Sequence, residues 1–317
     1  LESQLYMYNV QRFFDHKVVD KNGGLDFYAT SKLNTTLFGF RNQVNYKFSR
    51  QENFIAGLLL ERQCVSHYDE TAIIDSGVPN RYSVSQLDKN GDATPDVNNY
   101  AVYAQQESSL LDDALTITGG LRLDQFDQLD SRVSPRLGLT YNSSQNWSTK
   151  LLWGRAFRKP TLLEQYEVRS DNNSPGNPGL TPEDIETTEA EYTYSFSQKT
   201  YASIAVFRSK MLHFIQTVDL QPYQNNENTL VIPGATLEWN SHFDLDGWRL
   251  GVAANYTRLR TDIAGAAPAS ANVMLFSDND KMGFYVGANS LGRRNAGAGY
   301  HAFVTNSQLK GRENNKA

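Results

Sequence analysis

Two arginines and a glutamate near the middle of the chain are the first candidates for ligand chemistry. Arg155 and Arg158 lie three residues apart, and Glu164 and Tyr166 follow closely. An arginine guanidinium is a planar fork that holds a carboxylate through two hydrogen bonds. The two arginines and Glu164, with Tyr166 as a further residue, are therefore candidates for contact with an anionic ligand or with a carboxylate elsewhere in the protein. The expectation that we favour is that these charges hold a loop against the rest of the fold.

A second candidate is a polar run that resembles a calcium-binding loop. It places side-chain oxygens at alternate positions, as calcium loops do, on Asp88, Asn90, Asp92 and Asp96. The pattern is incomplete, because Ala93 occupies the position where such a loop has glycine and Asn99 the position of its bidentate glutamate. We expect no cofactor: a run of this composition is more often a solvated turn, and a structural calcium ion is the alternative.

Composition and charge exclude several classes of function. The 317 residues carry a net charge of −5 and one cysteine. Basic residues are scattered, so nucleic acid is not an expected partner, and neither a disulfide nor a zinc site organises the fold. We find no nucleophile elbow, phosphate-binding glycine loop or metalloprotease motif, so the sequence does not predict an enzyme.

Alternation of apolar and polar residues dominates the sequence and predicts an all-β, antiparallel fold. No run of 18 apolar residues occurs, which excludes a transmembrane helix, whereas segments of about ten alternating residues suit strands that cross a bilayer. In the segment 38–48, the even positions are mostly apolar or aromatic and the odd positions carry Arg41, Gln43, Asn45 and Lys47. About fourteen strands are expected, at 2–15, 32–48, 53–68, 99–110, 115–127, 133–142, 147–157, 185–197, 200–213, 229–240, 247–260, 268–277, 281–292 and 298–309.

The connections between these strands alternate between short and long. Short links are expected near 50–52, 111–113, 142–146, 197–199, 242–246 and 278–280. Longer loops are expected near 16–31, 69–98, 158–184 and 214–228. Short turns on one side and long loops on the other are typical of an outer-membrane β-barrel.

Aromatic residues support a membrane barrel, because tryptophan and tyrosine collect at the two membrane interfaces. Four of them flank expected short turns, as a periplasmic girdle would: Tyr141, Trp147, Tyr201 and Trp248. A soluble β-sandwich or barrel is the alternative, since it too uses alternating aromatic and β-branched residues.

One motif resembles a known family. The sequence runs Gly154-Arg-Ala-Phe-Arg158-Lys-Pro160, then Leu163-Glu-Gln-Tyr166, Asn177-Pro-Gly-Leu180 and Pro182-Glu183. It resembles TonB-dependent outer-membrane receptors, in which Gly-Arg-Ala-Phe-Arg-Ala-Pro leads to Leu-x-Glu-Leu-Tyr and Asn-Pro-Asn-Leu-x-Pro-Glu. The departures are minor and lie at Lys159, Gln165, Gly179 and Thr181.

The resemblance implies a 22-stranded transmembrane β-barrel whose lumen holds a plug. Residues 1–317 are then expected to be a partial barrel domain, with the N-terminal plug and some terminal strands absent. The implied location is the bacterial outer membrane, and the implied partners are membrane lipid, a metal-chelate ligand and, through the plug, the TonB complex.

The function that the resemblance implies is energised uptake of a metal chelate, with a ferric siderophore as the first choice and cobalamin as the alternative within the family. A passive porin and a soluble β-rich binding protein are the rivals from other classes.

Overall fold

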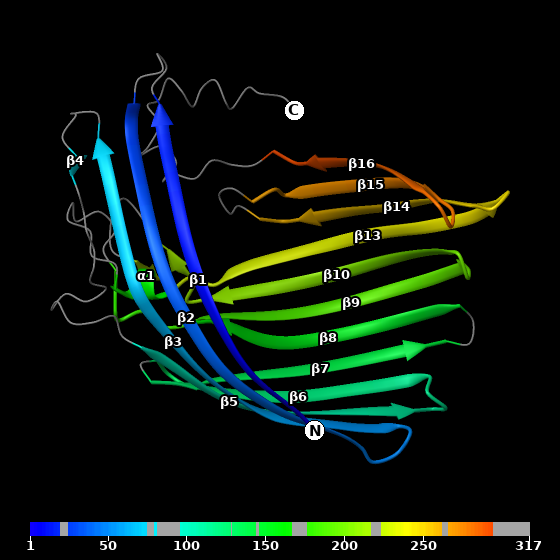
Figure 1. Cartoon of the computed structure of the whole chain (residues 1–317). Helices are drawn as coiled ribbons and strands as arrows, with labels where there is room; N and C mark the ends of the chain where they lie inside the picture. The colour runs from blue at the N-terminus through cyan, green and yellow to red at the C-terminus, as the bar shows by residue number, and fades with distance from the viewer. Residues whose placement is uncertain are drawn as a thin grey trace.

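The chain forms one large, curved antiparallel sheet (Figure 1). The computed structural model describes residues 1–19, 25–74, 79–80, 96–127, 129–143, 146–166, 176–216, 223–261 and 266–293. The sheet contains β1 (Glu2–Val19), β2 (Leu25–Lys47), β3 (Glu52–Ile74), β4 (Pro79–Asn80), β5 (Val97–Leu110), β6 (Leu115–Phe126), β7 (Arg132–Asn142), β8 (Trp147–Arg158), β9 (Glu183–Ser197), β10 (Thr200–Leu212), β13 (Leu230–Leu245), β14 (Trp248–Leu259), β15 (Ala269–Asp278) and β16 (Gly283–Leu291).

Each long strand pairs with its neighbours in the sequence, so the sheet is a series of hairpins that runs from β1 to β16. Within the described residues, β1 and β16 are the two edges and the barrel is not closed. A helix of five residues, α1 (Leu162–Tyr166), and a small hairpin of β11 (Ile215–Gln216) and β12 (Gln224–Asn225) lie outside the sheet. No helix among the described residues is long and apolar enough to cross a membrane.

The all-β prediction is confirmed, and the first thirteen expected strands coincide with strands of the sheet. The fourteenth, 298–309, lies outside the described residues. The expected loop at 16–31 is wrong, because β1 continues to Val19 and β2 already begins at Leu25. The expected loop at 69–98 also begins too early, since β3 extends to Ile74.

The link expected at 242–246 is shorter than the sequence analysis predicted. Strand β13 continues to Leu245, and the turn consists of Asp246 and Gly247. Both residues have positive φ, 48° and 79°. Positive φ at both central residues is the geometry of a two-residue hairpin turn, and Asp-Gly is among the dipeptides that adopt it most readily.

The sheet is curved, and its concave face is polar. A cavity of about 1280 Å³ opens on this face and is bounded by residues from β1 through β9. Its lining includes three arginines, Arg41, Arg122 and Arg136. Lys150 of β8 is 3.0 Å from Glu191, the residue opposite it on β9. This face is therefore suited to water or to another polar part of a protein.

The opposite face is apolar and exposed. Large side chains that stand on it include Val44, Leu58, Leu121, Leu151, Ile204 and Leu237, each more than a third exposed. A soluble protein rarely leaves so large an apolar surface uncovered. In a membrane barrel this face meets lipid.

Aromatic rings gather on the sheet at the end that carries the short turns. The rings of Tyr141 and Trp147 are 5.4 Å apart, and Trp147 stacks on Tyr192 at 6.0 Å. Trp248 stacks on Phe284 at 6.1 Å. Tyr201 does not belong to this group, contrary to expectation, because its hydroxyl donates to Glu238 at 2.8 Å. Since Ile204 and Val206 face outward on the same strand, the odd position 201 faces the concave side.

Gly251 of β14 provides a test of how tightly the concave face is packed. A Cβ at this position would lie 2.2 Å from Cζ of Phe276, the residue directly opposite on β15. We expect Gly251→Ala to force that ring to move and to cost about 1–3 kcal/mol of stability. Gly287→Ala is the control, because its Cβ would meet one backbone oxygen at an ordinary 3.8 Å. Equal unfolding midpoints for the two variants in detergent would contradict the prediction.

Candidate functional site

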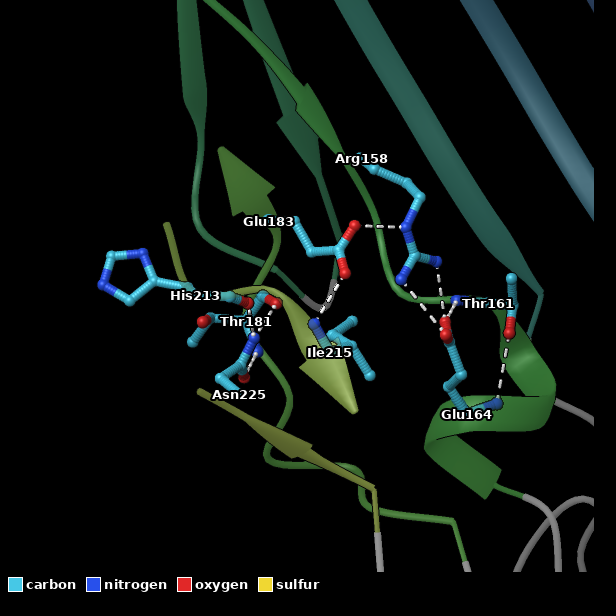
Figure 2. A network of polar contacts seen from close by, with 8 residues as sticks. All are labelled: Arg158, Thr161, Glu164, Thr181, Glu183, His213, Ile215 and Asn225. Carbon is cyan, nitrogen blue, oxygen red and sulfur yellow. Dashed lines mark hydrogen bonds and ion pairs between the residues drawn. The ribbon is translucent and has the colours of Figure 1, made fainter. Parts of the chain in front are cut away.

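The family-like motif forms a network at the end of the sheet where the long loops lie, here called the loop end. Arg158, the last residue of β8, uses all three guanidinium nitrogens (Figure 2). Its Nη1 and Nη2 donate to the two carboxylate oxygens of Glu164 at 2.9 and 3.1 Å, and its Nε donates to Glu183 at 2.5 Å. Arg158 therefore joins β8, α1 and β9.

Helix α1 is fixed at its start by a capping box. The Glu164 backbone N–H donates to Oγ1 of Thr161 at 3.2 Å, and the Thr161 backbone N–H donates to the Glu164 carboxylate at 2.7 Å. This reciprocal pair satisfies two backbone donors that a helix start otherwise leaves free. Glu164 therefore both caps the start of α1 and pairs with Arg158.

The part of the β8–β9 loop that leads into β9 is hydrogen-bonded to the β11–β12 hairpin and to the residues before it. The other oxygen of Glu183 accepts a hydrogen bond from the Ile215 backbone at 2.6 Å. The Asn225 amide accepts from the Thr181 backbone N–H at 2.8 Å and donates to the Thr181 carbonyl at 2.9 Å and the His213 carbonyl at 2.6 Å. Figure 2 shows these contacts side by side with the Arg158 network. These hydrogen bonds join the β8–β9 loop and the β11–β12 hairpin into one unit, here called the rim.

Asp184 is the centre of a second charged group at the same rim. The residue is 4% exposed, and its carboxylate lies 3.0 Å from Arg155, 3.9 Å from Arg132 and 3.9 Å from Nδ1 of His213. These partners come from β8, from the start of β7 and from the end of β10. A buried carboxylate requires such compensation, since transfer of an uncompensated charge out of water is costly.

The structure therefore joins Arg158 to Glu164, as a loop-holding role requires, and places Arg155 in a separate pair with Asp184. Tyr166 ends α1, but its side chain lies outside the described set. Ligand binding by Arg155, Arg158, Glu164 and Tyr166 remains a prediction. Neither Thr161 nor Asp184 was expected from the sequence. The spacing of Thr161 and Glu164, which suits a capping box, was the signal that could have revealed Thr161.

The concave wall beside this rim carries further paired charges. Arg122 donates to the Asp124 carboxylate at 2.8 and 2.7 Å, and Asp124 is 1% exposed. Lys159 extends from the loop toward β3, where its Nζ is 3.3 Å from Oε1 of Gln63. Burial lowers the pKa of Lys159 below its ordinary value, although Glu61 acts in the opposite direction.

The candidate calcium loop is described only in part. Asp88, Asn90 and Asp92 lie outside the described residues, and the Asp96 carboxylate is paired with Arg62. Within the described part of the chain, no group of three metal-ligating side chains occurs. Calcium binding by the loop stays a prediction.

The Arg158 network should respond to acid through Glu164. Burial of the Glu164 carboxyl opposes its ionisation, but hydrogen bonds from Arg158 and Thr161 outweigh that burial and hold the pKa of Glu164 below its ordinary 4.5. A carboxyl with a lowered pKa contributes stability above about pH 4.5 that is lost as the pH falls through the lower, folded-state value. We therefore expect the difference in thermal unfolding midpoint between the parent protein and Glu164→Gln to shrink between pH 7 and pH 3. A difference that is the same at both pH values would refute this.

Three comparisons with known proteins agree with this geometry. Residues 3–312 match the sequence model of the family described as "TonB dependent receptor-like, beta-barrel". A stretch of 113 residues, 36% of this chain and 17% of the relative, is 28% identical to the vitamin B12 transporter BtuB of Vibrio cholerae.

Solved structures share the fold at low sequence identity. The siderophore receptor PirA from Acinetobacter baumannii superposes with a TM-score of 0.63 at 16% identity, over 94% of this chain and 50% of PirA. The copper transporter OprC superposes with a TM-score of 0.66 at 12% identity, over 93% of this chain and 49% of OprC. The chain thus spans about half the length of these solved structures. Because the family model covers nearly all of its residues, this chain belongs to the family of TonB-dependent receptor β-barrels.

Proposed function

We propose that the chain forms the wall of an outer-membrane receptor that takes up a metal chelate with energy supplied through TonB. The ligand class proposed first is a ferric siderophore. Residues 1–317 act in this proposal as part of the barrel domain, and the contact with TonB is made through a plug rather than through the barrel wall. The protein is an importer and not an enzyme.

The observation that carries the proposal is the contrast between the two faces of the sheet. The concave face has a cavity of about 1280 Å³ with arginine, glutamate and tyrosine side chains in its lining, whereas the outward face bears exposed leucine, valine and isoleucine. A wall that is polar inside and apolar outside fits a membrane barrel with a filled lumen. Membership of the receptor family supports the same conclusion.

The rim network gives this wall an ordered outer end. We propose that a ligand meets the receptor at this rim, where Arg155, Arg158, Glu164 and Tyr166 lie on or beside the loop. Arg158 is already saturated by Glu164 and Glu183, so its part is to hold the loop in place. Arg155 is the better candidate for direct contact with an anionic chelate, because within the described residues it pairs with one carboxylate, Asp184, whereas Arg158 pairs with two.

Cobalamin is the second candidate ligand. It is favoured by one observation, the 28% identity with a vitamin B12 transporter over 113 residues. The similarity in fold does not choose between the ligands, because a siderophore receptor and a copper transporter resemble the chain about equally well.

Uptake by cells distinguishes these ligands. The gene is deleted from its host, and accumulation of radiolabelled ferric siderophores and of labelled cobalamin is measured with and without the gene restored on a plasmid. We expect restored, energy-dependent accumulation of a ferric siderophore. Accumulation of cobalamin alone would favour the second candidate, and uptake that survives collapse of the proton gradient would favour a passive porin.

A further inference from the structure

The outward face carries a group of exposed arginines at the loop end, above the apolar band. Arg208 of β10, Arg258 of β14 and Arg260, just after β14, are all exposed. Within the described part of the chain, no hydrogen bond or ion pair involves the guanidinium of any of the three. Most other arginines near this rim have an acidic partner, as Arg155 and Arg158 do.

The strand register places the three arginines together on one side of the sheet. Arg208 is opposite Pro233 of β13, whose carbonyl accepts from the Arg260 backbone at 2.9 Å, and Arg258 is opposite Ala235. Arg208 and Arg260 are therefore separated by two strand spacings, about 10 Å. The β13 residues between the arginines are Pro233 and Ala235, which carry no charge.

The direction that these arginines face follows from the rows below them. Two outward-facing rows nearer to the short turns than Arg208, the side chains are apolar or aromatic. They are Ile204, Leu237 and Tyr256, each about half exposed. Since side chains alternate along a strand, positions 206 and 208 share the face of Ile204, and positions 258 and 260 share the face of Tyr256. The sheet thus passes from apolar to basic on the surface that meets lipid.

An apolar groove adjoins the arginines. It has a volume of about 570 Å³ between β7 and β10 and is lined by Leu137, Leu151, Trp153 and Val206, together with Arg208. Trp153 and Arg208 lie in one row, because both pair with Thr188 of β9. The groove has room for a hydrocarbon chain and ends beside a cation.

Among the residues that the structure describes, two acids near Arg208 have to be considered, and neither pairs with the three arginines. Glu186 is 3.6 Å from Lys210 and is matched by it. Glu189 contributes to the groove but also lines the cavity on the concave side. The outward surface at this point is therefore positive.

We propose that this surface, Arg208 with Arg258, Arg260 and the adjoining groove, binds a phosphorylated lipid of the outer leaflet, with phosphate on the arginines and an acyl chain in the groove. Arginine suits phosphate, because its planar fork donates two hydrogen bonds to the oxygens. The inference rests on the proposed function in one respect, that the outward face lies in the outer membrane with the loop end outside.

The test measures binding of diphosphorylated lipid A, and of the same lipid without its phosphates, to the receptor purified from membranes in detergent. We expect the phosphorylated lipid to bind more tightly, each of Arg208→Gln, Arg258→Gln and Arg260→Gln to weaken it roughly fivefold, and the triple variant roughly a hundredfold. Arg208→Lys keeps the charge and should retain most of the affinity. The matched control is Arg50→Gln, an exposed arginine in a short turn at the opposite end of the sheet.

Equal affinity of the parent and triple variant would overturn the proposal, as would equal affinity for the two lipids or an equal loss in Arg50→Gln. The single variants keep the test valid if the triple variant does not fold. Membrane fractionation of the parent protein separates the two claims. If it is absent from the outer membrane, the proposed function fails, whereas presence there without lipid binding overturns only this inference.

Discussion

Arg158→Ala is expected to lower the free energy of unfolding by about 2–3 kcal/mol and to release the loop between β8 and β9. Removal of one partner from a buried ion pair costs about 3–5 kcal/mol, because the other charge is left uncompensated. The expected loss is smaller here, since the Arg158 side chain is 43% exposed. The loss is still large because two carboxylates, Glu164 at 17% and Glu183 at 13% exposed, would remain beside each other without a cation.

Denaturant unfolding from lipid bilayers and limited trypsin digestion of the loop measure this effect. Arg158→Lys should recover only part of the stability, because an ammonium group cannot make the three hydrogen bonds of the guanidinium in the same geometry. Adding Glu183→Gln to Arg158→Ala should restore some stability by removing one of the two uncompensated charges. If Arg158→Ala unfolds and is digested like the parent protein, the network does not hold the loop.

Arg155→Ala is the comparison within the same strand. Asp184 would lose the contact at 3.0 Å but would keep Arg132 and His213 at 3.9 Å. We therefore expect a smaller loss of stability than for Arg158→Ala, and a larger loss would show that the Asp184 group is the main support of the rim.

The strands could be predicted from sequence wherever apolar residues on one face alternate with polar residues on the other. In β10, Ile204 and Val206 face outward while Ser203 faces inward, so the alternation is strict and the strand is evident. In β1 the pattern ends at Asp15, His16 and Lys17, although the strand continues to Val19. In the proposed membrane barrel, a strand that extends beyond the bilayer has water on both faces, so alternation no longer marks it.

The rim could be predicted only where its contacts are local. Arg158 and Glu164 are close in sequence, and the motif indicated a loop-holding role for them. The partners of Asp184 are Arg132 of β7, Arg155 of β8 and His213, which follows β10, and no spacing in the sequence reveals that they meet. Its central position became visible once the sheet register was known.

Leu151→Arg is expected to destabilise the receptor in bilayers by about 2–4 kcal/mol, whereas Leu152→Arg is expected to cost much less. Leu151 stands in the middle of β8 on the outward face, where it is 48% exposed, and a guanidinium there must be carried into lipid. Leu152, its neighbour, lines the concave cavity and is opposite Glu189, which can compensate a new positive charge. The two substitutions change the same residue type on the same strand and differ in the face that receives the charge.

Denaturant titration of both variants, refolded into vesicles, measures the difference directly, and repetition in detergent micelles supplies the control. Micelles adapt around a charge more readily than a bilayer does, so the gap between the variants should narrow there. Equal losses in bilayers would mean that the outward face does not meet the hydrocarbon, and the assignment of the two faces, on which both the uptake function and lipid binding at Arg208 depend, would fail with it. A larger loss for Leu152→Arg would place lipid on the concave side, so the assignment of the two faces would have to be exchanged.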